Sequence, residues 1–392
     1  MGGGGVSAPA PGGFVPPPYP FDRLDGLRAL ATAHDGGVVD LSVGTPCDSP
    51  PEAVMAALAD PVAARGYPPS VGTPALRRAA AGWMARRFGV EVDERAVATC
   101  VGTKELVAGL PTWLRLRWPQ RDVVLHPAVA YPSYAMGATL AGAQAVPVPA
   151  RSDGTSDLAA LPEELWARAL VLWVNSPANP TGRLDDLDRV VAEARARGVL
   201  VASDECYAEF VWTGEPATAL RDGTRGVLAV HSLSKRSNMA GLRAGFYAGD
   251  EDLVAYLSEL RKHAGFMVPG PVQAAMVAAL EDDVHVELQR ARYLERLEFL
   301  VSLLASHGYR CSLPDGAFYV WATKDGERAA RVTGWDLAEE LANSAGILAS
   351  PGELYEAAPG WVRLAAVQPM DRLRLAGERM DGERPARVPP VV

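Results

Sequence analysis

The sequence predicts an α/β protein with two domains: a three-layer αβα large domain around a mostly parallel mixed sheet, and a smaller α+β domain. Its 392 residues exceed the length of one ordinary domain. Between residues 96 and 248, short apolar runs alternate with patterns typical of helices, an order that predicts parallel strands joined by helices. After residue 270, long helical patterns precede a few separate strands, which indicates the smaller domain.

The boundaries between the domains follow from composition and pattern. Residues 1–18 are rich in glycine and proline with almost nothing to bury, so we expect a disordered tail. We expect residues 46–285 to form the large domain. The small domain would combine an N-terminal segment, residues 19–45, with a C-terminal segment, residues 286–392.

Each expected strand of the large domain is a short, continuous apolar run, as when helices cover both faces of a sheet. These strands span residues 96–101, 122–126, 170–174, 199–202, 227–230 and 244–248. The helices expected between them span residues 104–116, 131–141 and 184–197. For the small domain the patterns predict long helices over 271–307, a helix at 335–344, and strands at 309–311, 318–321 and 361–365.

Composition argues against several classes of protein. The chain is 48% hydrophobic and 22% charged, as globular proteins are, and its net charge of −9 argues against nucleic acid as a partner. Its four cysteines lack metal-binding spacing, so we expect no metal site and reduced thiols in a cytoplasmic protein. No apolar run reaches the ~18–20 residues of a membrane span, and no signal-peptide pattern is present.

Lys235 is the first candidate for catalysis. It follows an apolar run, stands among serines in Ser232-Leu233-Ser234-Lys235, and precedes Arg243 by eight residues. A cofactor aldehyde needs an amine that can be neutral at pH 7, which arginine cannot supply. Burial and nearby positive charge lower the pKa of a lysine and make it nucleophilic. Taken alone, however, Lys235 equally fits an ordinary loop lysine.

Other candidates also follow expected strands, where ligands bind in α/β proteins. The turn Gly102-Thr103-Lys104 leads into a helix whose first N–H groups would suit a phosphate, although many such turns contain glycine. Residues 175–182 contain two prolines and a glycine that would fix Asn179 as a rigid amide donor, or would simply form a turn.

Asp204 follows another expected strand. A carboxylate buried there needs a cationic partner, which a protonated pyridine nitrogen would supply; Asp204 could equally cap a helix. Tyr207 can reach a phenolate oxygen of the same ring, and Ser232 and Arg243 can donate to a phosphate. Together with the aromatic Tyr131, these residue types match what pyridoxal phosphate requires: a phosphate site, a stacking face, donors to O3′, an acid for the ring nitrogen, and an amine.

The motifs Asn179-Pro180-Thr181-Gly182 and Ser232-Leu233-Ser234-Lys235, followed by Arg243, are specific enough to suggest a family. The chain resembles the fold-type I pyridoxal-phosphate aminotransferases of classes I and II over residues 41–363. More narrowly, it is similar to the actinobacterial N-succinyldiaminopimelate aminotransferases. The stretches that carry this narrower likeness are residues 40–47, 65–70, 231–238 and 261–269.

The resemblance implies a role for each candidate. The catalytic residues would be Lys235, which binds the cofactor aldehyde and acts as base, Asp204, which holds the pyridinium, and Tyr207. Asn179 and Tyr207 would bond the O3′ oxygen, and Tyr131 would stack on the ring unless it packs into the core. The Lys104 side chain would contact the phosphate or point outward. The whole phosphate site would comprise Gly102, Thr103, Lys104, Ser232 and Arg243.

The resemblance also implies a homodimer with shared active sites, because Tyr67 would reach the cofactor phosphate of the neighbouring subunit. Arg363 would clamp the substrate α-carboxylate, together with Asn179 and a backbone donor from Gly44. A distal substrate carboxylate needs a further cation or donor, and the candidates are Arg28, Arg261 and Lys262.

By this resemblance the expected reaction is transamination between an amino acid and the glutamate/2-oxoglutarate pair. The expected amino acid is N-succinyl-LL-2,6-diaminopimelate, in lysine biosynthesis. Specificity for aspartate or aromatic amino acids is the main alternative, and a C–S β-lyase with the same cofactor residues is a weaker one. A regulator that joins this fold to a helix-turn-helix module is disfavoured, because it would need a basic N-terminal extension in place of the Gly/Pro-rich one.

Overall fold

Seven strands form the central sheet of the large domain, in the order β2-β8-β7-β6-β5-β3-β4. The computed structural model describes residues 13–326 and 331–382. β8 alone runs opposite to the other six strands, so the sheet is mixed but mostly parallel, as predicted. The strands are β2 (Val97–Val101), β3 (Val123–Pro127), β4 (Gln144–Val148), β5 (Ala169–Asn175), β6 (Val201–Asp204), β7 (Val227–Ser232) and β8 (Ala244–Gly249).

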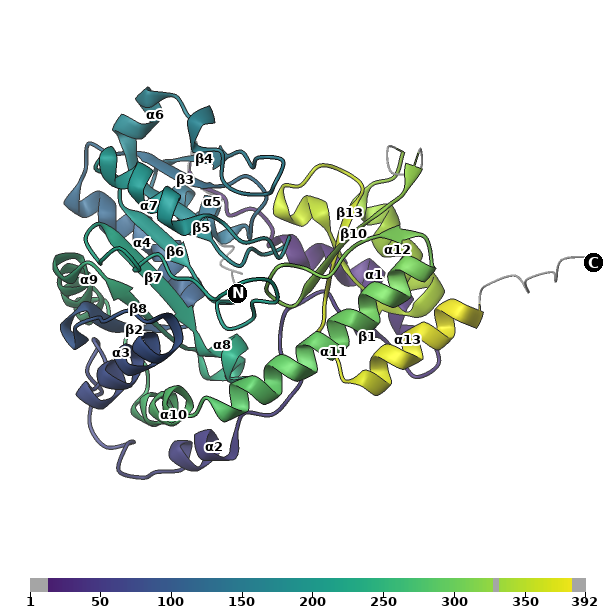
Figure 1. Cartoon of the computed structure of the whole chain (residues 1–392), viewed down its shortest axis with the longest axis horizontal. Helices are drawn as coiled ribbons and strands as arrows, with labels where there is room; N and C mark the ends of the chain where they lie inside the picture. Colours follow the sequence, from purple (N-terminus) through teal and green to yellow (C-terminus); the bar gives the residue numbers. More distant parts are fainter. Residues whose placement is uncertain (1–12, 327–330, 383–392) are drawn as a thin grey trace, which may run out of the picture.

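Helices cover both faces of this sheet because its strands are apolar on both sides. One hydrophobic cluster packs helices α3, α7 and α10 against the sheet, and a second cluster packs α4, α5 and α9 against the opposite face. This gives the three layers seen in Figure 1. Their bounds are α3 (Pro74–Phe88), α4 (Thr103–Arg117), α5 (Ser133–Leu140), α7 (Leu187–Ala196), α9 (Glu251–His263) and α10 (Gly270–Glu281), with the shorter α2 (Glu52–Leu58) and α6 (Glu163–Arg168) beside them.

The small domain combines both ends of the described chain. Its sheet has the order β12-β13-β10-β9, and a separate parallel pair joins β1 to β11. The N-terminal segment packs into the same hydrophobic cluster as the C-terminal segment. The strands are β1 (Val39–Asp40), β9 (Tyr309–Arg310), β10 (Tyr319–Lys324), β11 (Ile347–Leu348), β12 (Ser350–Pro351) and β13 (Trp361–Ala365); the helices are α1 (Asp25–Thr32), α12 (Gly334–Ala345) and α13 (Met370–Gly382).

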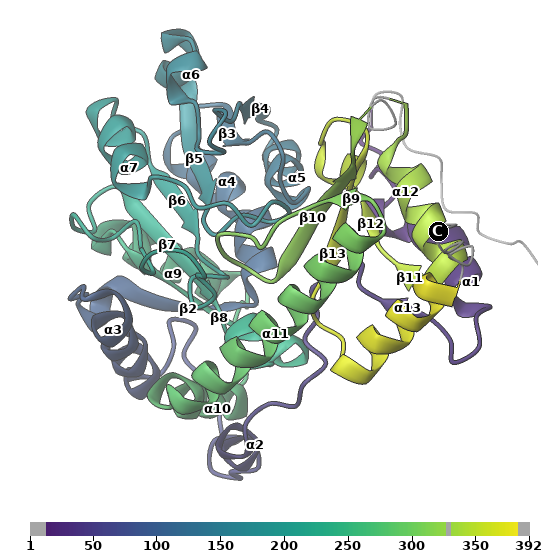
Figure 2. The same cartoon turned by 45° about the vertical axis from the view of Figure 1, so that its right-hand side comes forward.

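The long helix α11 (Val284–Ser306) runs from the end of α10 into the small domain (Figure 2). The exact domain boundaries therefore remain a prediction, because helix α11 is shared between the large and the small domain. The expected tail falls largely on residues 1–12, outside the described residues, and residues 13–18 have no regular structure. No described helix is long and apolar enough to cross a membrane.

Several elements were not predicted, among them helices α3 and α9, strand β4 and helix α13. Strand β4 is the edge strand of the large sheet, and it contains the exposed Gln144 and Pro147 instead of a continuous apolar run. Helix α13 buries only a narrow stripe of residues, among them Leu373 and Met380, against the small domain. Strand β4 and helix α13 are both only partly buried, so the apolar pattern in their sequences is weak.

Candidate active site

A cavity of about 560 Å³ lies where the carboxyl ends of the large-domain strands meet the small domain. Its walls combine segments that are far apart in the sequence, including the β2–α4 turn, the loop after β5 and strand β13. Apart from the candidates for a distal carboxylate, all of the predicted site residues line it except Gly102 and Tyr67; those that do are Gly44, Thr103, Lys104, Tyr131, Asn179, Asp204, Tyr207, Ser232, Lys235, Arg243 and Arg363.

Lys235 lies on the single-turn helix α8 (Leu233–Arg236), directly after β7. Its amine donates to the backbone oxygen of Gly44. Burial lowers the pKa of Lys235 to about 8, and the positive charges of Arg363 and Arg243 act in the same direction, against the opposing influence of Cys206. A substantial fraction of this amine is therefore neutral near pH 7–8, as an amine nucleophile requires.

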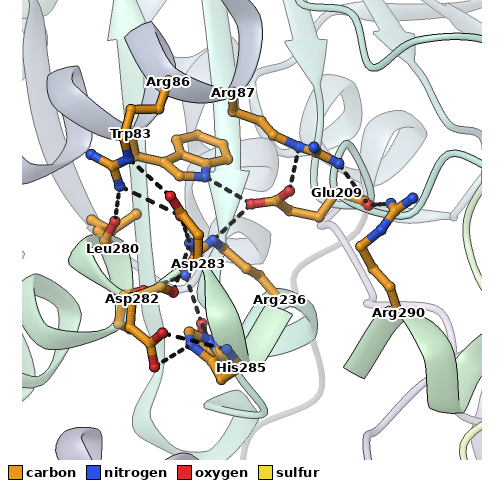
Figure 3. Close-up of polar contacts among 12 residues, drawn as sticks. Trp83, Arg86, Arg87, Glu209, Arg236, Leu280, Asp282, Asp283, His285 and Arg290 are labelled. Atoms are coloured by element: carbon orange, nitrogen blue, oxygen red, sulfur yellow. Dashed lines mark hydrogen bonds and ion pairs between the residues drawn. The ribbon is translucent and has the colours of Figure 1, made fainter. Parts of the chain in front are cut away.

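Helix α8 is held by a buried ionic cluster behind the cavity (Figure 3). The Glu209 carboxylate accepts from Arg236 Nε at 2.9 Å and from Trp83 Nε1 at 2.7 Å, and it pairs with Arg87 Nε at 2.6 Å. The side chains of Glu209 and Arg236 are only 7% and 4% exposed. Because Arg236 is the neighbour of Lys235 in the chain, this cluster fixes the backbone from which the catalytic amine projects.

Asp204 ends strand β6, and its carboxylate lines the cavity. One carboxylate oxygen accepts from the Tyr134 hydroxyl at 2.7 Å and the other accepts from the Cys206 backbone N–H at 3.2 Å. Burial raises the pKa of Asp204, while these donors pull in the opposite direction. Tyr134 was not predicted as a site residue. Its position three residues after Tyr131, on the same side of a helical turn, is the signal that could have indicated it.

The turn before α4 has the features of a phosphate cradle. Gly102 has φ of +73°, and a side chain there would collide with the Arg243 guanidinium. No side chain caps α4, so the N–H groups of Thr103 and Lys104 at its start remain free for a ligand. The Ser232 hydroxyl accepts from the Ser234 N–H at 3.2 Å and keeps its own proton to donate.

The Lys104 side chain lies at the rim of the cavity. Its ammonium is 3.1 Å from the Tyr19 hydroxyl and 3.3 Å from that of Tyr131, and it lies 4.4 Å from the centre of the Tyr19 ring. The Tyr19 and Tyr131 hydroxyls are 2.6 Å apart. Tyr19 was not predicted for the site, because it arrives from the N-terminal segment.

Arg363 is buried in the cavity wall and is 2% exposed. Its Nη1 donates to Asn179 Oδ1 at 2.7 Å and its Nη2 donates to the backbone oxygen of Ser42. Its Nε is buried without a hydrogen-bond partner among the described residues. A cation with an unused donor in a closed cavity suits a substrate carboxylate.

Tyr207 lies beside this arginine, and its hydroxyl is 2.6 Å from that of Tyr319. Burial raises the pKa of Tyr207, and Tyr319 adds to this effect, so its hydroxyl keeps its proton. Tyr319 lines the cavity as well and was not predicted. It belongs to β10 of the small domain, 112 residues away from its partner.

The three residues expected to bind a distal substrate carboxylate lie outside the cavity. Arg261 is buried in a bidentate ion pair with Glu105, at 2.6 and 2.9 Å. Arg28 pairs with Asp40 at 2.8 Å, and Lys262 is exposed. None of the three lines the cavity, so the expectation that one of them binds substrate was wrong.

Tyr67 also lies outside this cavity, on the surface of the single chain, with 97% of its area exposed. Nothing within one chain therefore explains this large, exposed aromatic residue. Its role across a dimer stays a prediction.

The residues fit pyridoxal phosphate. The free N–H groups before α4, with Ser232 and Arg243, suit the phosphate, and the buried Asp204 suits a protonated ring nitrogen. Lys235 provides the amine with a lowered pKa. No cluster of three or more metal-ligating side chains occurs in the described ranges.

Known proteins resemble this chain over most of its length. The family described as aminotransferase class I and II matches residues 36–377. The chain belongs to this family. It is 44% identical over 373 residues to the 4-dedimethylamino-4-oxo-anhydrotetracycline transaminase of Streptomyces rimosus, covering 93% of this chain and 99% of that protein.

Two further similarities extend over nearly the whole chain. The LL-diaminopimelate aminotransferase of Desulforudis audaxviator is 38% identical over 380 residues, covering 93% of this chain and 95% of that protein. The solved structure of a probable N-succinyldiaminopimelate aminotransferase from Thermus thermophilus has a TM-score of 0.82 and 31% identity, covering 93% of this chain and 99% of that chain. The protein is thus a pyridoxal-phosphate-dependent aminotransferase of fold type I, as its motifs predicted.

The residues of the cavity divide the chemistry among them. When bound, the cofactor supplies an electron sink that makes the substrate Cα proton acidic. The Lys235 amine would accept that proton and return it, and its lowered pKa of about 8 would suit both directions. Arg363 would orient the substrate by its α-carboxylate, and the Asp204 carboxylate would favour positive charge on a group bound opposite it.

Proposed function

We propose that the protein transfers an amino group between N-succinyl-LL-2,6-diaminopimelate and the glutamate/2-oxoglutarate pair, in lysine and diaminopimelate biosynthesis. The observation that carries this proposal is a pair of cations, Arg363 and Lys104, that line one cavity. Within the described part of the chain neither forms an ion pair with a carboxylate. Both glutamate and the proposed substrate carry a second carboxylate, so each could engage both cations.

In this proposal Lys104, and not Arg28, Arg261 or Lys262, binds the distal carboxylate of the substrate. Its ammonium is held by hydroxyl groups of Tyr19 and Tyr131, which are weak partners that a carboxylate can outcompete. The likeness to enzymes named for diaminopimelate and N-succinyldiaminopimelate supports the same class of substrate.

A second candidate is an aminotransferase of aromatic amino acids. Three aromatic residues line the cavity around Lys104, and Phe21 lies 5.5 Å from the Tyr19 ring and 6.0 Å from the Tyr131 ring, centre to centre. Such a wall could stack on an aromatic side chain. Aspartate is a third candidate, because it also carries a second carboxylate.

We also propose that the protein is a cytoplasmic homodimer with shared active sites. The exposure of Tyr67, at 97%, supports contact with the cofactor phosphate of a second copy. Sedimentation should give twice the mass of one chain. Tyr67→Phe should weaken cofactor binding by roughly ten- to hundredfold, as expected for one hydrogen bond to a charged group. A monomer with unchanged cofactor affinity on this substitution would contradict the dimer proposal.

The substrate is tested by single-turnover reactions of the holoenzyme, followed by the loss of its visible cofactor absorbance. The donors are N-succinyl-LL-diaminopimelate, LL-diaminopimelate, glutamate, aspartate and phenylalanine. We expect glutamate and the N-succinyl compound to react fastest. Lys104→Met should slow both of them and leave an uncharged donor such as alanine unaffected. Preference for phenylalanine, with no response to Lys104→Met, would favour the aromatic candidate instead.

A further inference from the structure

The Tyr134 hydroxyl makes a direct hydrogen bond to a carboxylate that faces the cavity. Tyr134 is 2% exposed, and its Oη lies 2.7 Å from Asp204 Oδ2. The ring is fixed from the other side by Trp173 of β5, with ring centres 5.3 Å apart. The hydroxyl therefore has little freedom to leave Asp204.

Asp204 needs this donor because it is buried. Burial alone favours the neutral carboxyl and raises its pKa, whereas each hydrogen bond donated to it favours the anion. Tyr134 can act only as a donor here, since burial and the adjacent Asp204 raise its pKa far above the usual range. The other donors to the carboxylate are the backbone N–H and the thiol of Cys206.

Further ionisable groups surround Asp204 from several elements. The Lys235 amine favours the anion. The remaining groups are acids, which supply no positive charge to favour the anion; they are Cys100, Glu205, Cys206 and Tyr319.

We propose that Tyr134 is a positioning residue that keeps Asp204 ionised and aimed into the cavity, so that the cofactor ring nitrogen opposite it retains its proton. Without the hydroxyl the carboxylate becomes a stronger base. The proton then moves from the ring nitrogen to Asp204, and the ring draws electrons less strongly. This role depends on the cofactor and not on which amino acid is the substrate.

The test compares two tyrosine-to-phenylalanine variants in the holoenzyme. Tyr134→Phe removes one oxygen and keeps the ring that packs on Trp173. Tyr293→Phe is the matched control, because Tyr293 is also buried, but in the small-domain cluster and away from the cavity. Each protein is reconstituted with pyridoxal phosphate labelled with ¹⁵N at the ring, and the ¹⁵N chemical shift is followed against pH.

We expect a protonated nitrogen across the neutral range in the unaltered protein and in Tyr293→Phe. In Tyr134→Phe the shift should move toward that of the neutral nitrogen. Its kcat should fall roughly ten- to hundredfold while KM changes little, the range expected for one hydrogen bond to a charged group. A protonated nitrogen together with an unchanged kcat in Tyr134→Phe would overturn the proposal.

A further variant and the choice of readout distinguish a hydrogen-bonding role of Tyr134 from a packing role. Tyr134→His keeps a ring N–H donor, so it should restore part of the nitrogen protonation that Tyr134→Phe loses. If Tyr134→His and Tyr134→Phe give the same ¹⁵N shift, the hydroxyl acts only by filling space and the proposal fails. The ¹⁵N readout needs no turnover, so it remains informative even if the proposed substrate is wrong.

Discussion

Arg363 Nη1 lies 2.7 Å from Asn179 Oδ1, and this bond joins two residues that are 184 positions apart. Arg363 belongs to β13 of the small domain, while Asn179 lies in the loop that follows β5 of the large domain. A substrate carboxylate that binds this guanidinium is therefore held between the two domains. The site is complete only when both domains are in place.

The first prediction concerns this arginine. Arg363→Lys should lower kcat/KM for every amino donor by roughly ten- to hundredfold, because an ammonium cannot reproduce the paired donors of a guanidinium. Steady-state kinetics with glutamate measure the effect. Arg310→Lys is the control, since Arg310 is 63% exposed on the same sheet, and it should leave kcat/KM unchanged. Equal effects of the two substitutions would contradict the assigned role.

The second prediction concerns pH. The pKa of Lys235 is lowered from 10.5 to about 8, chiefly by burial, and only its neutral form attacks an aldehyde. The rate at which apoprotein captures pyridoxal phosphate should therefore rise with pH, reach half its maximum near pH 8 and level off above that. Stopped-flow absorbance of the forming complex measures this rate. A profile that keeps rising toward pH 10 would show an unperturbed lysine.

The third prediction concerns the cluster behind Lys235. Glu209→Gln leaves Arg236 and Arg87 without their buried carboxylate, so the free energy of unfolding should fall by about 3–5 kcal/mol. Denaturant titration measures this change. Glu259→Gln removes an exposed partner of Lys262 and should change stability by less than ~1 kcal/mol. A small loss for Glu209→Gln would mean that the cluster does not hold α8.

The fourth prediction concerns the phosphate cradle. Gly102→Ala places a side chain against the Arg243 guanidinium at φ of +73°, so it should weaken cofactor affinity strongly. Gly142→Ala is a matched control, because Gly142 has φ of +61° with open space around it. Both substitutions should cost about 1–2 kcal/mol of backbone strain, but only the first should raise the Kd for pyridoxal phosphate. Fluorescence titration of the apoproteins tells them apart.

Most strands of the large sheet could be predicted from local sequence, for a physical reason. Strands β5 and β7 are continuous apolar runs because helices cover both sheet faces, and the motif residues follow strand ends, where ligands bind in this class of sheet. Lys235 and Asp204 could thus be expected at strand ends beside one cavity, where the structure places them.

What could not be predicted depends on long-range contacts. Tyr134 meets Asp204 across 70 residues, and Lys104 meets Tyr19 across 85. Local pattern does not encode such pairings, because a tyrosine on a helix is more often a core residue. Local sequence likewise did not show that Arg261 pairs with Glu105, 156 residues away, so Arg261 was a candidate for binding substrate.

The most direct test of the central claim is to find the lysine that binds the cofactor. The holoenzyme is reduced with borohydride, digested and analysed by mass spectrometry. The sequence has only four lysines, at positions 104, 235, 262 and 324, so each possible site is distinguishable. We predict the reduced cofactor mass on the peptide that contains Lys235 and on no other. Its absence there, or its presence on another lysine, would contradict the account.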